Sequence, residues 1–362
     1  MLSQPDIAPY LVDAGLIGKA AVANRAVRVR DVSRRNSVFI ATAEGSPAFV
    51  LKQARSPADS AIAREATVLR ALASLREPVG LGEVVPRLVA YDEGHQVLVL
   101  EATPEARDLR RHFAPGRLST TLAGAAGRAL ALLHSVPLAA TGPRPGSLDL
   151  TWLLSWHRPR LEDLSELSAV SIELLRMTQA SKVMCESLDE LRESWRPASQ
   201  VHGDSRWENW IAVPASRSRR WNRLLLVDWE LAGDGDPCLD VGAFFGEYLL
   251  AWLESIPVID GREPGRLAHH ARVPLGRIQP SLRSFWHAYV EMSRANGTSH
   301  ALVRSVRFAA VRLIQAALER ARDSSELRAG MVLSLQLAAN LLERPREGAE
   351  RVLGLLVPER AL

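Results

Sequence analysis

Apolar and polar positions follow two different patterns along the chain, and the change comes after roughly the first hundred residues. Within this first part, short apolar runs bounded by turn residues predict five strands, and helical spacing predicts a helix between the third and fourth strands. A short amphipathic helix is expected over 5–20. This order predicts a small antiparallel sheet with one helix packed on it. The expected strands are 27–29, 38–42, 48–52, 85–90 and 97–100, and the expected central helix is 58–75.

The chain from residue 103 onward is mostly helical in pattern. Leu122, Ala126, Ala129 and Leu133 share one face of a predicted helix, and a longer apolar stripe begins at Leu302. Short strands interrupt this pattern over residues 200–230. The sequence therefore predicts an α+β fold with two lobes, 1–100 and 101–362. Further helices are expected within 150–195 and over 241–254, 281–294, 302–322 and 326–342, with a loop over 261–280.

Composition indicates a globular protein without a membrane anchor. Of the 362 residues, 47% are hydrophobic and 24% are charged, which is ordinary for a soluble chain. We expect no transmembrane helix, because no run of 18 apolar residues occurs, and no signal peptide at the start. The two cysteines, Cys185 and Cys238, form no disulfide framework, so a cytoplasmic location is expected.

The net charge of +4 comes almost entirely from arginine, since lysine occurs only at positions 19, 52 and 182. This bias is typical of codon composition, but it draws attention to each lysine. The positive charge is small and scattered, so no nucleic-acid partner is expected. It slightly disfavours a polycationic substrate and slightly favours an anionic one.

One constellation of polar residues follows two short predicted strands. Asp204 comes after His202-Gly203, Asn209 lies five residues further on, and Asp228 ends the apolar run 224–227. Alone, Asp204 would more often cap a helix and Asn209 would more often form a turn. Together they match the needs of phosphoryl transfer from a nucleotide, in which one carboxylate takes a proton and two oxygen ligands hold Mg²⁺.

This motif resembles that of the aminoglycoside phosphotransferase and choline kinase-like enzymes, over about residues 25–300. The resemblance implies a bilobal protein-kinase-like fold, ATP and Mg²⁺ as cofactors, Asp204 as catalytic base, and Asn209 and Asp228 as metal ligands. It further implies that a buried Asp240 braces the catalytic loop. The matching residues are His202, Gly203, Asp204, Asn209, Asp228, Gly235, Asp236, Pro237 and Asp240.

The same resemblance implies a nucleotide site in the N-terminal part. Lys52, at the end of the third strand, would bind the α- and β-phosphates, and Glu65 in the next helix would pair with it. A chance surface Lys–Glu pair is the alternative. The segment 31–37 would cover the phosphates without a glycine-rich pattern, and the hinge after 100 would read adenine through backbone groups. The residues assigned to these two roles are Ser33, Asn36 and Ser37 for phosphate, and Glu101 and Thr103 for adenine.

Two positions depart from the common family pattern. Arg206 stands where many relatives have a His or Lys, so it either neutralises charge on the transferring phosphoryl group or stacks on Trp207 at the surface. Trp229-Glu230 replaces the Phe-Gly of protein kinases, so no mobile activation segment of that type is expected.

Details of the loops resemble one branch in particular, the peptide Ser/Thr phosphotransferases of class V lanthipeptide and thioamitide biosynthesis. The resemblance implies a ribosomally made precursor peptide as acceptor and a separate lyase that eliminates the phosphate. The alternatives are a kinase for an aminoglycoside, another antibiotic or a metabolite, and a non-catalytic pseudokinase scaffold. The peptide is favoured because dense acidic clusters occur only over 162–173 and 186–193 in the helical part. Arginines that would repel a polycation are present instead, at 217, 219, 220, 223, 304, 307 and 312.

Overall fold

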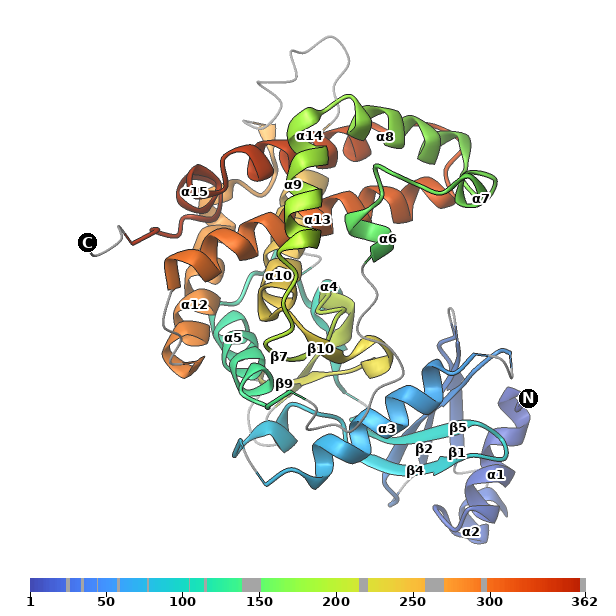
Figure 1. Cartoon of the computed structure of the whole chain (residues 1–362). Coiled ribbons are helices and arrows are strands. Elements are labelled where there is room, and N and C mark those ends of the chain that lie inside the picture. The colour runs from blue at the N-terminus through green and yellow to red at the C-terminus, as the bar shows by residue number, and fades with distance from the viewer. Residues whose placement is uncertain are drawn as a thin grey trace.

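The protein has two lobes, with a sheet-containing lobe below and a larger helical lobe above in Figure 1. This structure is a computed structural model. It describes residues 1–23, 27–33, 36–43, 45–56, 59–76, 78–103, 105–113, 116–138, 151–214, 221–257, 270–293 and 298–358.

The N-lobe contains a five-stranded antiparallel sheet in the order β1-β2-β3-β5-β4. Side chains alternate between its faces. Leu98 and Leu100 join the core cluster on the side of α3, while Val97 and Val99 pack with residues of the N-terminal helix α1. Because both faces are covered, β5 is apolar and buried from Val97 to Leu100. The strands are β1 (Val27–Asp31), β2 (Ser37–Ala43), β3 (Ala48–Gln53), β4 (Leu88–Asp92) and β5 (Val97–Ala102), and α3 is Ala61–Ser74.

Two predicted N-lobe elements differ from those observed. The single helix expected over 5–20 is instead α1 (Ile7–Asp13) and α2 (Lys19–Ala23), because the chain turns at Gly15, whose φ is +68°. The fourth strand begins at Leu88 rather than at residue 85. Val84 and Val85 are buried beside a short 3₁₀ turn, so their apolar character reflects core packing and not a strand.

The C-lobe is built around two tightly packed helix pairs, α5 with α12 and α10 with α13. Glycines allow the close approach: a Cβ at Gly127 would lie 2.2 Å from the Phe285 carbonyl oxygen, and one at Gly242 would lie 2.4 Å from the Phe308 Cβ. These two helix pairs support the catalytic loop. The long helices are α5 (Thr120–His134), α8 (Ala169–Gln179), α9 (Lys182–Glu193), α10 (Pro237–Glu254), α12 (Leu275–Ser293), α13 (Thr298–Arg322) and α14 (Ala329–Glu343).

Short strands interrupt the helical lobe, as the sequence predicts. They pair as β7 with β10 and as β6-β8-β9. The loop expected over 261–280 is wrong in its second half, where α12 begins at Leu275 and accommodates Pro280 in its second turn; residues 258–269 lie outside the described residues. The strands are β6 (Arg107–Asp108), β7 (Ser199–Val201), β8 (Trp210–Pro214), β9 (Trp221–Leu226) and β10 (Gly233–Gly235).

None of the helices in the ranges given above is both long and apolar enough to cross a membrane.

Candidate active site

The catalytic loop begins directly after β7 and is fixed by a buried carboxylate. Asp240, in the first turn of α10, accepts hydrogen bonds from the His202 amide (2.7 Å) and the Gly203 amide (2.9 Å). Its Oδ2 also lies 3.2 Å from the His134 Nε2. Burial alone would raise the pKa of the Asp240 carboxyl, but the His134 hydrogen bond and the loop amides outweigh burial and lower it. The geometry agrees with the bracing role expected for Asp240.

Asp204 is buried in this loop and is held by two donors of the chain. The Arg206 Nε lies 2.7 Å from Oδ1 and its Nη2 lies 2.8 Å from Oδ2. The Asn209 amide nitrogen donates to the same Oδ2 and to the Asp204 carbonyl, both at 2.9 Å. The carboxylate that the sequence assigns as base is therefore preorganised by its own loop.

Asn209 and Asp228 are brought together by the pairing of β8 with β9. Trp210 pairs with Leu226 in register, and the Val227 amide donates to the Asn209 carbonyl at 2.9 Å. Asp228 adopts a left-handed conformation with φ of +71°, which is rare for a residue with a Cβ and is typical of functional loops. The two side chains offer an amide oxygen and a carboxylate, the hard ligands that suit Mg²⁺.

Lys52 connects the two lobes at the opposite wall of the site. Its Nζ donates to both oxygens of Glu65, at 2.8 and 2.9 Å, and to the Asp228 Oδ1 at 2.9 Å. Burial would lower the pKa of the Lys52 ammonium, but the two carboxylates outweigh it and raise this pKa. The alternative of a surface Lys–Glu pair is wrong, because Glu65 is fully buried.

The predicted phosphate-covering loop lies at the entrance between the lobes. The Ser33 hydroxyl accepts from the Val38 amide at 2.9 Å, and the buried Ser37 points its hydroxyl toward the sulfur of Met1. Asn36 donates to Glu230 at 3.4 Å and so reaches the C-lobe. Of the three residues, Asn36 is the one this geometry places beside the Asp228 segment, and the phosphate role of all three stays a prediction.

The predicted hinge residues lie where β5 leaves the sheet. The Glu101 amide donates to the Arg87 carbonyl at 3.0 Å, and the Thr103 carbonyl accepts from Ala106 at 3.0 Å. Adenine recognition, which stays a prediction, would therefore have to use the Glu101 carbonyl and the Thr103 amide. The Glu101 side chain pairs with Arg87 at the surface.

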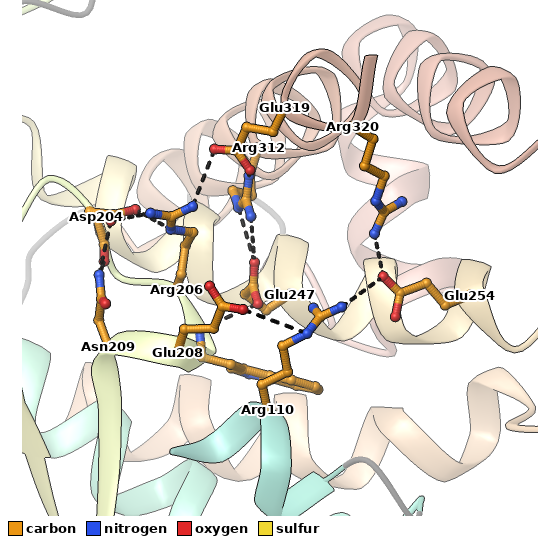
Figure 2. A network of polar contacts seen from close by, with 11 residues as sticks. Arg110, Asp204, Arg206, Glu208, Asn209, Glu247, Glu254, Arg312, Glu319 and Arg320 are labelled. Carbon is orange, nitrogen blue, oxygen red and sulfur yellow. Dashed lines mark hydrogen bonds and ion pairs between the residues drawn. The ribbon is translucent and has the colours of Figure 1, made fainter. Parts of the chain in front are cut away.

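A network of arginines and carboxylates extends from Asp204 into the helices of the C-lobe (Figure 2). Arg206 lies 3.3 Å from Glu319 through Nη1, and Arg312 holds the other oxygen of Glu319 at 3.3 Å. Arg312 also pairs with Glu247 at 3.0 Å, and Glu247 accepts from the Trp207 amide at 3.3 Å. Two carboxylates of the helices, Glu247 and Glu319, thus hold the catalytic loop.

The position of Arg206 excludes one of the two roles considered for this residue. Burial would lower the pKa of its guanidinium, but Asp204 and Glu319 outweigh burial and raise it. Trp207 is buried edge-on against Phe113 and Tyr248. The alternative of an Arg206 stacked on Trp207 at the surface is therefore wrong. Its predicted role at the phosphoryl group stays open.

The arginines that were expected to face an acceptor are already paired. Arg304 pairs with Asp236 and donates to Ser194, Arg307 pairs with Glu190, and Arg312 has the partners given above. The Arg223 Nε donates to the Glu83 carbonyl at 3.2 Å, and residues 217, 219 and 220 lie outside the described residues. The charge argument against a cationic acceptor is corrected accordingly, since folding also gathers carboxylates near Asp204.

Glu319 further lines an open cavity between the end of α13 and the start of α14. The cavity has a volume of about 520 Å³ and is lined by Glu319, Arg320, Asp323, Ser324, Arg328, Gly330 and Met331. Sequence reasoning missed Glu247 and Glu319 as site residues, and it named Arg312 only as a charge that would repel a cationic acceptor. The helical stripe marks which positions of α13 are buried, but it does not show that their charges reach a loop about a hundred residues earlier.

The fold and this site define a kinase-like phosphotransferase, and the comparisons identify its family. The profile of the phosphotransferase enzyme family, APH, matches residues 27–271. The chain belongs to this family and is an ATP-dependent phosphotransferase that acts on hydroxyl acceptors. The predicted bilobal kinase-like fold is confirmed. No curated protein was found whose sequence matches the chain.

Solved structures with similar folds include kinases of small alcohols. A choline/ethanolamine kinase family protein from Mesorhizobium loti has a TM-score of 0.56 at 19% identity, covering 95% of this chain and 96% of that one. Choline kinase LicA from Streptococcus pneumoniae has a TM-score of 0.51 at 14% identity, covering 92% and 99%. A structure of LicA in complex with AMP has a TM-score of 0.50 at 14% identity, covering 88% and 92%. At these identities the likeness concerns the fold.

Proposed function

We propose that this phosphotransferase moves the γ-phosphoryl group of ATP to an alcohol, with Asp204 as general base. The observation that carries the proposal is the continuous set of polar contacts that joins the two lobes. Lys52 joins Glu65 to Asp228, and Asn209, paired with the strand that delivers Asp228, orients Asp204. These contacts support the proposal, because they hold close together the types of group that phosphoryl transfer needs.

The bond changes follow from this arrangement. The oxygen of the acceptor forms a bond to the γ-phosphorus while the bond from that phosphorus to the β,γ-bridging oxygen breaks, and ADP leaves. Asp204 accepts the proton of the acceptor hydroxyl as the new bond forms. Arg206, which lies beside Asp204, would neutralise charge on the transferring group.

The nucleotide would lie between the lobes. Lys52, fixed by Glu65, would bind the α- and β-phosphates, with Ser33, Asn36 and Ser37 in the covering loop and Glu101 and Thr103 at the adenine. Asn209 and Asp228 are the residues that would hold Mg²⁺, which supplies positive charge to the phosphate oxygens when bound. We also propose that the boundary between the two lobes lies after residue 100.

For the acceptor, we propose Ser or Thr of a ribosomally made precursor peptide, followed by a separate lyase that eliminates the phosphate. The catalytic-loop resemblance supports this choice. The cavity beside Glu319 supports it further, because it is open and has exposed groups of both charges, Asp323 and Arg328, along which an extended chain can lie.

A small-molecule alcohol is the second candidate. The structural relatives include a choline kinase, and the carboxylates of Glu208 and Glu319 near the loop suit a cationic group as well as a peptide. A pseudokinase scaffold has less support, because it has no need for the contacts that Lys52 and Asn209 make. The free thiols of Cys185 and Cys238 support the proposed cytoplasmic location.

Offering the purified protein a set of acceptors tests the proposal. Mg-ATP is incubated with a precursor peptide encoded near this gene, with choline and with an aminoglycoside panel, and mass spectrometry measures phosphate gain on each. We expect phosphate on the peptide and none with Asp204→Asn. Phosphate on choline or an aminoglycoside alone would contradict the peptide, and transfer to no acceptor would contradict the enzyme mechanism.

A further inference from the structure

The carboxylate of Asp204 is held on both oxygens by its own loop. The Arg206 Nη2 and the Asn209 amide both donate to Oδ2, at 2.8 and 2.9 Å, and the Arg206 Nε lies 2.7 Å from Oδ1 as an ion-pair contact without a hydrogen bond. An ionised carboxylate has about four lone-pair directions. The two donors to Oδ2 take both of its directions, and the Arg206 Nε stands against Oδ1, so the guanidinium has to shift for an alcohol to approach Oδ1 from that side.

A second carboxylate already holds the same guanidinium from the other side. Glu319 contacts the Arg206 Nη1 at 3.3 Å, the nitrogen that does not bond to Asp204 (Figure 2). Arg206 is largely buried, with 27% of its side chain exposed. A cation in such a place is costly to leave unpaired, so a guanidinium that leaves Asp204 needs a partner that stays.

Glu319 is itself fixed by the packing of α10 against α13. Its other oxygen accepts from the Arg312 Nη1 at 3.3 Å, and Arg312 is anchored by Glu247 at 3.0 Å. Gly246 of α10 makes room for this arginine, because a Cβ there would lie 2.7 Å from the Arg312 Cγ. The carboxylate that faces Arg206 therefore belongs to a rigid part of the C-lobe.

We propose that Glu319 is a positioning residue that acts through Arg206. It holds the guanidinium through Nη1 while Nε and Nη2 release Asp204 and turn toward the transferring phosphoryl group. Glu319 thereby allows Arg206 to cover the Asp204 carboxylate in the resting enzyme and to uncover it during transfer. This inference rests on the proposed role of Asp204 as base.

The first test is Glu319→Gln, which keeps the shape of the side chain and removes its charge. We expect kcat to fall roughly tenfold to a hundredfold, the range for a misplaced catalytic group, with the KM for Mg-ATP unchanged and part of the rate restored in Glu319→Asp. Glu254→Gln is the matched control. Glu254 pairs with Arg110 and Arg320, and its side chain is 39% exposed against 35% for Glu319. An equal loss in both variants would contradict the proposal.

A double-mutant cycle with Arg206→Gln separates positioning from a structural role. Glu319→Gln should cost little further rate once the guanidinium is absent, because coupled residues are not additive. The same loss in both backgrounds would overturn the proposal. Turnover is measured with the acceptor found in the panel above, or as hydrolysis of Mg-ATP by water.

The NMR signals of the Arg206 guanidinium give a readout that needs no turnover. They are assigned by their loss in Arg206→Gln. We expect them to change in Glu319→Gln and to stay as in the wild type in Glu254→Gln, and unchanged signals in Glu319→Gln would overturn the inference. A protein that transfers phosphate to no acceptor would instead contradict the proposed function, while these signals would still decide the role of Glu319.

Discussion

The two walls of the site are built from charged groups in opposite ways. On the nucleotide side, Lys52, Glu65 and Asp228 form one compact cluster in which the lysine and its glutamate are closed off from water. On the acceptor side, Arg206 and Glu319 form a partly exposed pair, which Arg312 joins to the buried Glu247. On the nucleotide side, Lys52 has one fixed set of partners, whereas on the acceptor side Arg206 can exchange one carboxylate for another.

This difference predicts how each wall responds to mutation. A buried pair that loses one member leaves an uncompensated charge in a medium that solvates it poorly, so the fold suffers. A partly exposed pair is screened by water, so its loss costs little stability. We therefore expect mutations on the nucleotide side to lower the free energy of unfolding and mutations around Asp204 to lower the rate of transfer. The following predictions test this contrast, from the largest effect to the smallest.

Asp204→Asn should have the largest effect on rate and almost none on the fold. The amide keeps the shape of the carboxylate but cannot take the proton, so the rate should fall by about 10²–10⁴. Calorimetry should show Mg-ATP binding as in the wild type, because Asp204 faces the acceptor. Near-normal turnover in steady-state kinetics would assign the base to another residue.

Lys52→Ala should affect both binding and stability. It removes the proposed phosphate ligand and leaves the fully buried Glu65 without its cation, so the free energy of unfolding should fall by about 3–5 kcal/mol. Denaturant unfolding and Mg-ATP calorimetry measure the two effects. Lys182→Ala is the control, since that exposed lysine pairs with Glu186 at the surface and should change neither. Unaltered unfolding of Lys52→Ala would remove the contrast between the walls.

Asp228→Ala should likewise weaken Mg-ATP binding.

Asp240→Asn should lower the free energy of unfolding by about 1.5–3 kcal/mol, because it weakens charge-assisted bonds to the loop amides. The pKa of the Asp240 carboxyl is lowered in the folded protein. Its contribution is therefore complete above the ordinary carboxyl pKa of about 4 and is lost as pH falls through the lowered value. Urea unfolding of both proteins should show a constant difference from neutral pH to about pH 4 and a smaller one below. A difference that grows on acidification would contradict this sign.

Arg307→Gln should have the smallest effect. Arg307 pairs with the largely exposed Glu190 on α9, so its loss should cost less than about 1 kcal/mol and leave the acceptor KM unchanged. Acceptor titrations of the variant and the wild type provide the measurement. A raised KM would restore the original view that this arginine binds the acceptor.

Local sequence was sufficient for most of the elements. The strand that carries Lys52 and the helix that carries Glu65 can be read from apolar periodicity, whereas the pairing of the two side chains was implied by the family resemblance. Boundaries were less certain, as the split of 5–20 into two helices shows, because they depend on single turn residues such as Gly15. The positions of Ser33 and Ser37 could not be foreseen, since their hydroxyls take partners that the loop conformation selects.

The class of chemistry follows from the sequence alone, because Asp204, Asn209 and Asp228 lie on adjacent segments whose pairing is local. The surroundings of the base depend on tertiary packing. Glu247, Arg312 and Glu319 come from α10 and α13, and they reach the catalytic loop because glycines let these helices pack closely. Tertiary packing also paired the arginines at 304, 307 and 312 with carboxylates. A charge seen in a sequence has a sign, but its partner depends on which helices meet.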